Sequence, residues 1–197
     1  MSCEFVVFDL ETTGLSPRSH EIIQIAGTRI RNGVVVTKDG FFSYVRPEVP
    51  IPGSITEITG ISNRHVAKAP PICEALVAFS DFVGDSVLIA HIGQRFDGRF
   101  LSAACEQGRI KSRPVELIDS IHFSKRLFGT VCRTGHGLDV VLARMRVTIK
   151  GRRHDARGDV SGLAQAVERM WRKLCLDADC SGIPRTQTHL PKLSAQQ

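Results

Sequence analysis

An apolar run near the start of the chain, FVVFDLETTGL at residues 5–15, reads as a buried β-strand that ends in two acids. Side chains alternate along a strand, so Asp9 and Glu11 point to the same face from adjacent positions. Two neighbouring carboxylates repel unless a divalent metal, a basic side chain or open water lies between them. A strand that simply ends in a solvated turn explains these residues equally well, so the rest of the chain has to decide.

The order of the other patterns predicts an α/β fold. Three strand-like runs fill the N-terminal third: EFVVFDL, EIIQIAGTRI and, after the turn signal Asn32-Gly33, VVVTKDGFFSYV. A loop rich in Pro and Gly follows at residues 46–62. Beyond it, the apolar spacing predicts helices at 70–85, 96–108, 122–129, 137–147 and 159–176, and strands at 86–91 and 115–121. Antiparallel strands followed by strand-helix alternation predict a mixed sheet with helices packed on it.

One domain accounts for most of the chain. Its 197 residues are 42% hydrophobic, which is enough for a substantial core, and no repeat or linker divides them. We expect this domain to cover residues 1–176. Residues 177–197 show little periodicity, and we expect them to form a flexible C-terminal tail.

The charge favours a polyanionic partner. Lys and Arg number 26 against 20 Asp and Glu, which gives a net charge of +6. We find no secretory signal and no apolar stretch of membrane-spanning length. The six cysteines have no C-x-x-C spacing, so neither a zinc site nor a disulfide framework is indicated. We therefore expect an intracellular protein with reduced thiols, in the cytoplasm or the nucleus, that does not associate with membranes.

Two further pairs of polar residues bear on the acids of the first strand. His91 and Asp97 flank the turn between a predicted strand and helix, in AHIGQRFDGRFL. His154 and Asp159, in HDARGD, lie where the last helix begins. One strand end and two helix starts can thus bring acids from distant parts of the sequence into one cleft.

At this point the sequence resembles a known family, the DEDDh three-prime to five-prime exonucleases related to the proofreading subunit of bacterial DNA polymerase III. FDLETTG is similar to the first motif of that family, AHIGQRFDGRFL to the second and HDARGD to the third, in the same order. The resemblance spans residues 4 to about 174. It implies an α/β, ribonuclease H-like mixed sheet in which three antiparallel strands are followed by parallel strands, with helices on both faces.

One branch of the family is more similar still. The second-motif histidine and aspartate are usually five residues apart with Asn after the histidine, whereas here His91 and Asp97 are six apart. That longer spacing resembles the plant exonuclease-domain proteins associated with nuclear breakdown in maturing sieve elements. Ile92 stands where both groups have Asn, which puts in doubt any hydrogen bond that the Asn would make.

The resemblance implies a two-metal hydrolase. Asp9, Glu11, Asp97 and Asp159 would hold two Mg²⁺ or Mn²⁺ ions, which prefer oxygen ligands. One ion would acidify the attacking water and the other would stabilise the leaving 3′ oxygen. His154 would accept the proton of the water as general base. The products would be nucleoside 5′-monophosphates.

The resemblance also implies a pocket for the terminal nucleotide of a single-stranded or frayed 3′ end. Its expected residues are Leu10, Thr12, Thr13, Gly14 and Phe96. DLETTG differs from the oligoribonuclease form of the motif, in which Met follows Glu, and this favours DNA over RNA. Phosphates would pass a group of arginines around the second and third motifs, namely Arg95, Arg99, Arg152, Arg153 and Arg157.

Alternative roles remain open. His91 is expected to bond locally at a strand end, and His136 is a rival general base only if the third motif is misread. A noncatalytic nucleic-acid-binding or adaptor module could keep the same fold and basic surface. Such a module has no physical reason to keep four acids clustered on the face that binds nucleic acid, so the exonuclease is the preferred interpretation.

Overall fold

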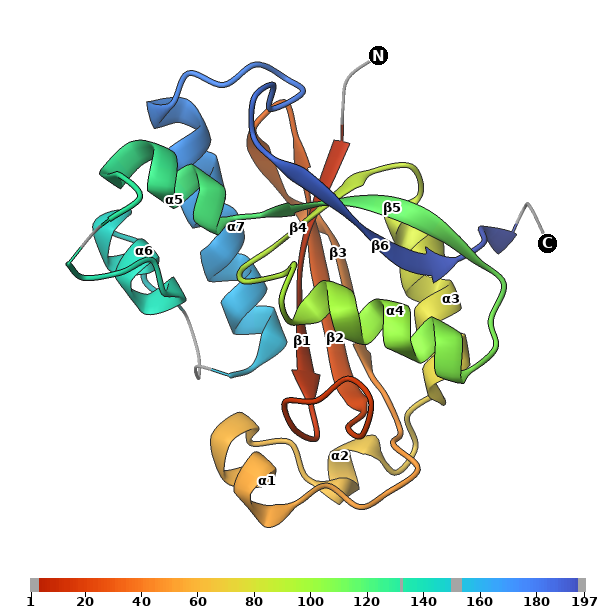
Figure 1. The fold of residues 1–197 in the computed structure, drawn as a ribbon. Coiled ribbons are helices and arrows are strands. Elements are labelled where there is room, and N and C mark those ends of the chain that lie inside the picture. Colours follow the sequence, from red (N-terminus) through yellow and green to blue (C-terminus); the bar gives the residue numbers. More distant parts are fainter. Residues whose placement is uncertain (1–3, 132, 150–153, 195–197) are drawn as a thin grey trace.

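The computed structural model describes residues 4–131, 133–149 and 154–194. In this part of the chain six strands form one mixed sheet, ordered β3-β2-β1-β4-β5-β6 (Figure 1). β1 to β3 form an antiparallel meander, β4 and β5 run parallel to β1, and β6 is antiparallel to β5. The strands are β1 (Glu4–Thr12), β2 (Ile22–Arg31), β3 (Val34–Tyr44), β4 (Val87–Ala90), β5 (Ser112–Asp119) and β6 (Arg185–Pro191).

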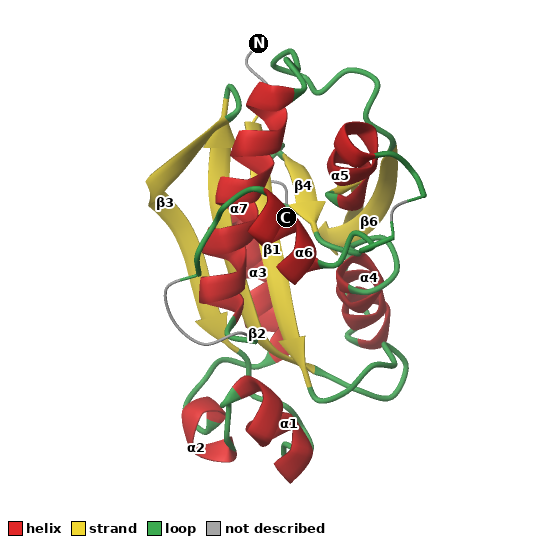
Figure 2. Ribbon diagram, turned by 90° about the vertical axis from the view of Figure 1, so that its left-hand side faces the viewer, coloured by secondary structure: helices red, strands yellow, loops and turns green. Residues whose placement is uncertain are grey.

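Helices cover both faces of this sheet (Figures 1 and 2). On one face lie α5 (Ile121–Phe128), α6 (Leu138–Arg144) and α7 (Ala156–Lys173), and on the other α3 (Ile72–Val83) and α4 (Asp97–Gln107). Two short helices, α1 (Gly53–Thr59) and α2 (Asn63–Val66), lie beyond the end of β1 and the start of β2. The prediction of three antiparallel strands followed by parallel strands between helices is confirmed.

The alternation of side chains along β1 determines which face of the sheet its two acids point to. Phe5 and Val7 are buried in the core under α5, α6 and α7, whereas Val6, Phe8 and Leu10 are buried in the core under α3 and α4. A strand covered on both faces reads as a continuous apolar run. Asp9 and Glu11 continue the series of Phe5 and Val7, so they face the side of the sheet on which α7 lies.

The segment expected to be a loop at residues 46–62 contains α1 and leads into α2. The Pro and Gly signals mark helix ends here, because Pro52 precedes α1 and Gly60 follows it at a φ of +75°. Ile51, Ile61 and Val66 pack with Ile23 of β2 in a small separate core, which holds these short helices against the sheet.

The C-terminal segment also differs from the expectation of a flexible tail, because residues 185–191 form β6. Thr188 and Leu190 are buried, and the Thr188 hydroxyl donates to the Gly98 carbonyl over 2.6 Å. Ser80 donates to the Pro191 carbonyl over the same distance. The segment is too short and too polar to show a strand pattern in sequence, yet it pairs with the edge of β5 and braces the start of α4.

Two other expectations concern thiols and membranes. The four cysteines in the described residues, Cys73, Cys105, Cys175 and Cys180, are free thiols, whereas Cys3 and Cys132 lie outside those residues. Among the helices described, none is both long enough and apolar enough to span a lipid bilayer.

Candidate active site

A cleft of about 660 Å³ lies at the end of β1 and gathers residues from five parts of the chain. Its walls come from the end of β1 and the following loop, from α1, from the β4–α4 turn, and from the starts of α6 and α7. The lining residues include all four predicted acids and the predicted base, namely Asp9, Glu11, Asp97, His154 and Asp159. The fold therefore brings together the polar residues that sequence analysis selected.

Three of these side chains are close enough to share a metal ion. One ligand atom each from Glu11, His154 and Asp159 lies within 4.8 Å of the others. Glu11 and Asp159 are buried, whereas His154 is exposed at the mouth of the cleft. Asp9 and Asp97 line the same cleft but do not belong to this close group.

The start of α7 is held in place by hydrogen bonds to β2 and within its own first turn. Gln24, which pairs with Glu11 across the β1–β2 ladder, accepts the Ala156 N–H at its Oε1 over 2.8 Å. Asp155 caps the helix by accepting the Arg157 N–H, and Asp159 accepts the His154 N–H over 3.1 Å. Since helix ends leave N–H groups without partners, these acceptors fix where Asp159 and His154 lie.

Asp97 is the most deeply placed acid. It begins α4, and its Oδ1 accepts the Leu10 N–H of β1 over 3.3 Å. Burial raises the pKa of the Asp97 carboxyl to about 7, and the nearby Asp119 carboxylate adds to that rise, while backbone hydrogen bonds oppose it. Without a cation, the Asp97 carboxyl therefore keeps its proton up to about pH 7.

The composition of the cleft fits a hard divalent cation. Four carboxylates line it, and no Lys or Arg occurs among its described lining residues. Carboxylate oxygens are the ligands that Mg²⁺ and Mn²⁺ prefer, and a bound cation would remove the cost of gathering these acids. The expected set of four carboxylate ligands thus fits such an ion, with His154 close to two of them.

The residues expected to bind the terminal nucleotide divide into two groups. Leu10, Thr12, Gly14 and Phe96 line the cleft, although the Leu10 side chain is buried in the core. Thr13 is not among the lining residues. Its hydroxyl instead accepts the Glu21 N–H over 2.9 Å and closes the β1–β2 loop.

Gly14 and Phe96 line the cleft and also pack closely against neighbouring rings. A Cβ on Gly14 would overlap the His20 ring, so the absence of a side chain makes room for that histidine. The Phe96 ring packs on Phe100 with centroids 4.9 Å apart. Both residues can still contact a ligand, because each also lines the cleft.

The histidines considered as alternatives are bonded locally. The Nδ1 of His91 lies 2.8 Å from the Ser120 hydroxyl, within the cleft wall. His136 makes the equivalent contact to Ser124 and is not among the lining residues. The structure therefore gives His136 no place beside the acids.

Ile92 adopts a left-handed backbone conformation, with a φ of +59°. This conformation is unfavourable for a β-branched residue and tolerable for Asn. Its N–H donates to Asp119 Oδ1 over 3.1 Å, and the same oxygen accepts the Ile121 N–H. The backbone conformation alone therefore favours Asn over Ile at this position of the chain, independent of any side-chain hydrogen bond.

Replacing Ile92 by Asn should therefore stabilise the protein. Relief of the strained backbone is expected to raise the free energy of unfolding by about 1 kcal/mol. Urea denaturation in EDTA would measure the change. Ile92→Val is the matched control, because Val keeps the branched Cβ and should bring no gain. Equal stability of the Asn variant and the wild type would show that the turn does not strain Ile92.

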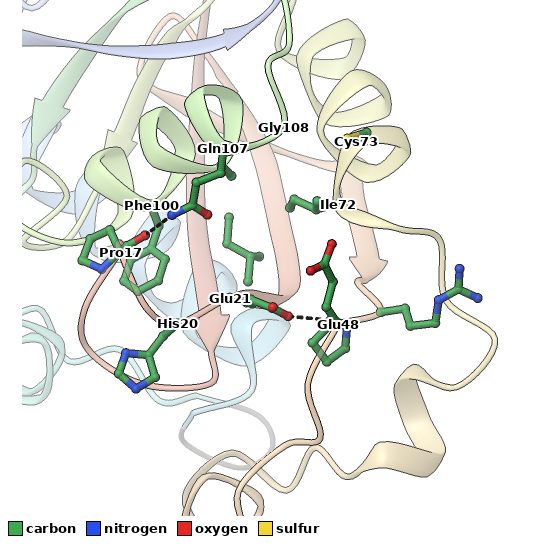
Figure 3. A pocket seen from close by; sticks show the side chains of 13 residues that line it. Pro17, His20, Glu21, Glu48, Ile72, Cys73, Phe100, Gln107 and Gly108 are labelled. Atoms are coloured by element: carbon green, nitrogen blue, oxygen red, sulfur yellow. Dashed lines mark hydrogen bonds between the residues drawn. The ribbon is translucent and has the colours of Figure 1, made fainter.

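A second hollow, of about 250 Å³, lies on the other side of the β1–β2 loop (Figure 3). The Gln107 amide donates to the Pro17 carbonyl over 3.1 Å, and the Glu48 N–H donates to Glu21 over 2.7 Å (Figure 3). These bonds tie the loop that carries Gly14 to α4 and to the segment after β3. The hollow contains none of the predicted catalytic residues, and we assign the chemistry to the larger cleft.

Comparison with known proteins identifies the family. The sequence profile of the exonuclease family RNase_T matches residues 6–167. The chain belongs to this exonuclease family. The DNA polymerase III PolC-type proteins of Streptococcus pyogenes are 36% identical to it over 145 residues, which make up 74% of this chain and 10% of the polymerase. This exonuclease domain thus spans about a tenth of the length of those relatives.

Solved structures share the fold of this exonuclease domain. The nuclease domain of 3′hExo, a DEDDh family member bound to rAMP, superposes with a TM-score of 0.76 at 21% identity, covering 94% of this chain and 96% of that one. Exonuclease X, bound to duplex DNA with a 5′ overhang, gives a TM-score of 0.70 at 22% identity over 89% and 95% of the two chains. The predicted ribonuclease H-like class is confirmed, while the particular closeness to the plant branch stays a prediction.

Two residues that organise this site were not predicted from the sequence. Gln24 holds the start of α7, and Asp119 holds the β4–α4 turn and raises the pKa of Asp97. Each is a polar residue within an apolar strand pattern, which is the signal that could have identified it. Two of the expected phosphate-binding arginines, Arg152 and Arg153, lie outside the described residues.

Proposed function

We propose that this exonuclease domain removes nucleotides from the 3′ ends of nucleic acid by metal-dependent hydrolysis. The observation that carries the proposal is the convergence of four carboxylates and one exposed imidazole in a cleft without a Lys or Arg among its described lining residues. A noncatalytic binding module would be expected to place cations, and not anions, where phosphates lie.

The four acids would hold two Mg²⁺ or Mn²⁺ ions. Such ions supply two effects when bound: they lower the pKa of a water, and they stabilise negative charge on the leaving oxygen. Asp9, Glu11 and Asp159 would supply oxygens from two neighbouring elements. Asp97 would supply one from the buried end of the cleft, where a cation would favour its ionised form.

His154 would act as the general base. Its ring lies close to Glu11 and Asp159, and its exposure leaves a path by which an accepted proton can reach solvent. The N–H of His154 is anchored to the Asp159 carboxylate, so the histidine is held beside the ligands and not on a free loop end. Hydrolysis with this arrangement would release nucleoside 5′-monophosphates.

The 3′-terminal nucleotide would lie between the first-motif loop and α1. Thr12 and Gly14 form one wall, Ile55 and Ile58 of α1 another, and Phe96 offers a ring on which a base can stack. A space bounded by loops on several sides suits a single-stranded or frayed end. DNA is proposed as the preferred substrate, on the resemblance of the first motif alone.

The decisive experiment uses the purified protein with 3′- and 5′-labelled single-stranded DNA and RNA, in Mg²⁺, Mn²⁺ or EDTA. The proposal requires stepwise loss from the 3′ end that depends on metal and disappears in Asp9→Ala. The relative rates on DNA and RNA decide the sugar preference. Binding without cleavage under every condition would instead favour the adaptor module.

A further inference from the structure

An exposed aromatic residue lies on β3, outside the catalytic cleft. Phe42 is 36% exposed, and the guanidinium of Arg157 lies 4.2 Å from the centre of its ring. The preceding residue, Phe41, faces the opposite core, where its ring packs on Phe79. Phe42 therefore belongs to the same face of the sheet as α7, and no core packing requires an aromatic ring there.

The ring of Phe42 begins a row of flat side chains. Tyr44, two residues further along β3, packs edge-on against Phe42 with ring centroids 5.0 Å apart. His65 of α2 stacks on Tyr44 at 5.8 Å. The row thus leads from Arg157 at the start of α7 to α2, which follows the α1 wall of the cleft.

Strand register connects this row to the catalytic acids. Asp9 pairs with Ala26, and Ala26 pairs with Phe42, while Glu11 pairs with Gln24 and Gln24 with Tyr44. Paired residues share a face, so the acids and the two rings lie at the two ends of the same cross-strand rows. The first turn of α7 packs on the middle of these rows, where Ala26 contacts Ala156 and Val160.

The first turn of α7 carries side chains of opposite charge on its two sides. Asp159 faces the catalytic cleft, whereas Arg157, two residues earlier and about 200° around the helix, lies over Phe42. The Arg157 side chain is 57% exposed, and its nearest carboxylate oxygen, on Asp155, is 3.7 Å away. A cation in this position is accessible to a phosphate.

A groove of about 570 Å³ runs between α7 and β3 beside these residues. Phe42 and Arg157 line it, together with Ser161 and Gln165 on the exposed side of α7. Glu168, the acid among the described residues that line this groove, is already engaged, because it accepts a hydrogen bond from Arg172 over 2.9 Å and another from the Val35 N–H. The groove thus offers a ring, a guanidinium and neutral polar groups.

We propose that Phe42, Tyr44 and Arg157 form a platform for the single-stranded part of the substrate upstream of the scissile bond. A base would stack on the Phe42 ring or on the guanidinium plane, while Arg157 also contacts a phosphate. This inference rests on the proposed function, since it assigns the platform the same nucleic acid strand that enters the cleft. Its occupant is nucleic acid because an exposed aromatic ring beside a cation matches alternating bases and phosphates.

The platform lies beyond the terminal nucleotides. Two strand spacings separate Phe42 from Asp9, which places their backbones about 10 Å apart. The first turn of α7 packs between them, so a strand has to pass around it. At about 3.4 Å per stacked nucleotide, the direct distance alone spans about three nucleotides, so a nucleotide beyond the third from the 3′ end is the first that can reach the platform. A dinucleotide occupies the cleft without reaching Phe42, whereas a twelve-nucleotide strand contacts both.

This length dependence gives the test. kcat/KM is measured for a single-stranded twelve-mer and for a dinucleotide. The value for the twelve-mer divided by the value for the dinucleotide is then compared between variants. Phe42→Ala should lower that ratio by about 5- to 150-fold, as expected for loss of one stacked base. Arg157→Gln should lower it as well and weaken its dependence on salt. Phe42→Trp keeps an aromatic face and should retain the ratio.

The chain offers a matched control. Phe128, exposed to 37%, also lies beneath an arginine, Arg144, at 4.6 Å, but lines neither the cleft nor the groove. Phe128→Ala should leave the ratio as in the wild type. An unchanged ratio in Phe42→Ala, or an equal loss on both substrates, would overturn the platform.

A binding measurement separates this inference from the proposed function. Fluorescence anisotropy of the labelled twelve-mer measures its affinity for the Asp9→Ala variant and for the double variant Asp9→Ala, Phe42→Ala. This measurement does not depend on turnover. Weaker binding by the Ala variant supports the platform even if the wild type hydrolyses neither substrate, in which case only the proposed function fails. Equal binding overturns the platform.

Discussion

Asp97→Asn is expected to abolish hydrolysis and to stabilise the metal-free protein at pH 8. The pKa of Asp97 is raised to about 7 by burial, with a contribution from Asp119, whereas an unfolded Asp ionises near pH 4. The folded state therefore retains a proton that the unfolded state has lost between these values. As pH rises through this window, wild-type stability falls by an amount on the order of a few kcal/mol, and Asn avoids this cost.

Denaturation in EDTA at pH 5 and pH 8 tests the sign of this effect. The stability advantage of Asp97→Asn should be larger at pH 8, while metal-dependent cleavage is lost at either pH. Asn can still accept the Leu10 N–H, so the local hydrogen bond survives. Asp179→Asn, at an exposed position, serves as the control and should show the same small change at both values. A variant less stable than the wild type at pH 8 would mean that the ionised carboxylate stabilises the fold.

The alternation of side chains along β1 makes the orientation of its two acids predictable from the sequence. Phe5, Val7, Asp9 and Glu11 share one face because strand side chains alternate, and a strand buried on both faces shows an uninterrupted apolar pattern. The positions of Asp97 and Asp159 at helix starts follow from the local sequence in the same way. Local patterns do not give the distance between these elements, because that distance depends on how the helices pack on the sheet.

The features that were not predicted from the sequence depend on contacts between residues far apart in the chain. Gln24 acquires its role only when β2 pairs with β1 and α7 packs above them, because its partner is Ala156, 132 residues away. β6 forms because the edge of β5 and the carbonyl of Gly98 are available, and its own pattern is too short to predict a strand. The left-handed backbone of Ile92 is likewise imposed by contacts with Asp119 and opposes the preference of the residue itself.

His154→Ala should lower kcat by about 10²- to 10⁴-fold, because general base catalysis contributes effects of this size. Binding of single-stranded DNA should change little, since the expected task of His154 is proton transfer. His136→Ala is the matched control, because that ring contacts Ser124 outside the cleft and its loss should leave turnover unaffected. Rapid-quench kinetics for the chemical step and anisotropy for binding would separate the two effects.

The proximity of His154 to Glu11 and Asp159 raises a second role that the same variant can distinguish. If His154 is a metal ligand, its removal must raise the Mn²⁺ concentration needed for half-maximal activity, and saturating metal should restore part of kcat. If it is the general base, the metal requirement stays near that of the wild type and no metal concentration restores turnover. A loss of DNA binding as large as the loss of kcat would contradict both roles and make His154 a substrate contact. The exposure of the ring and its anchored backbone favour the base, because a proton acceptor must exchange its proton with solvent after each cleavage.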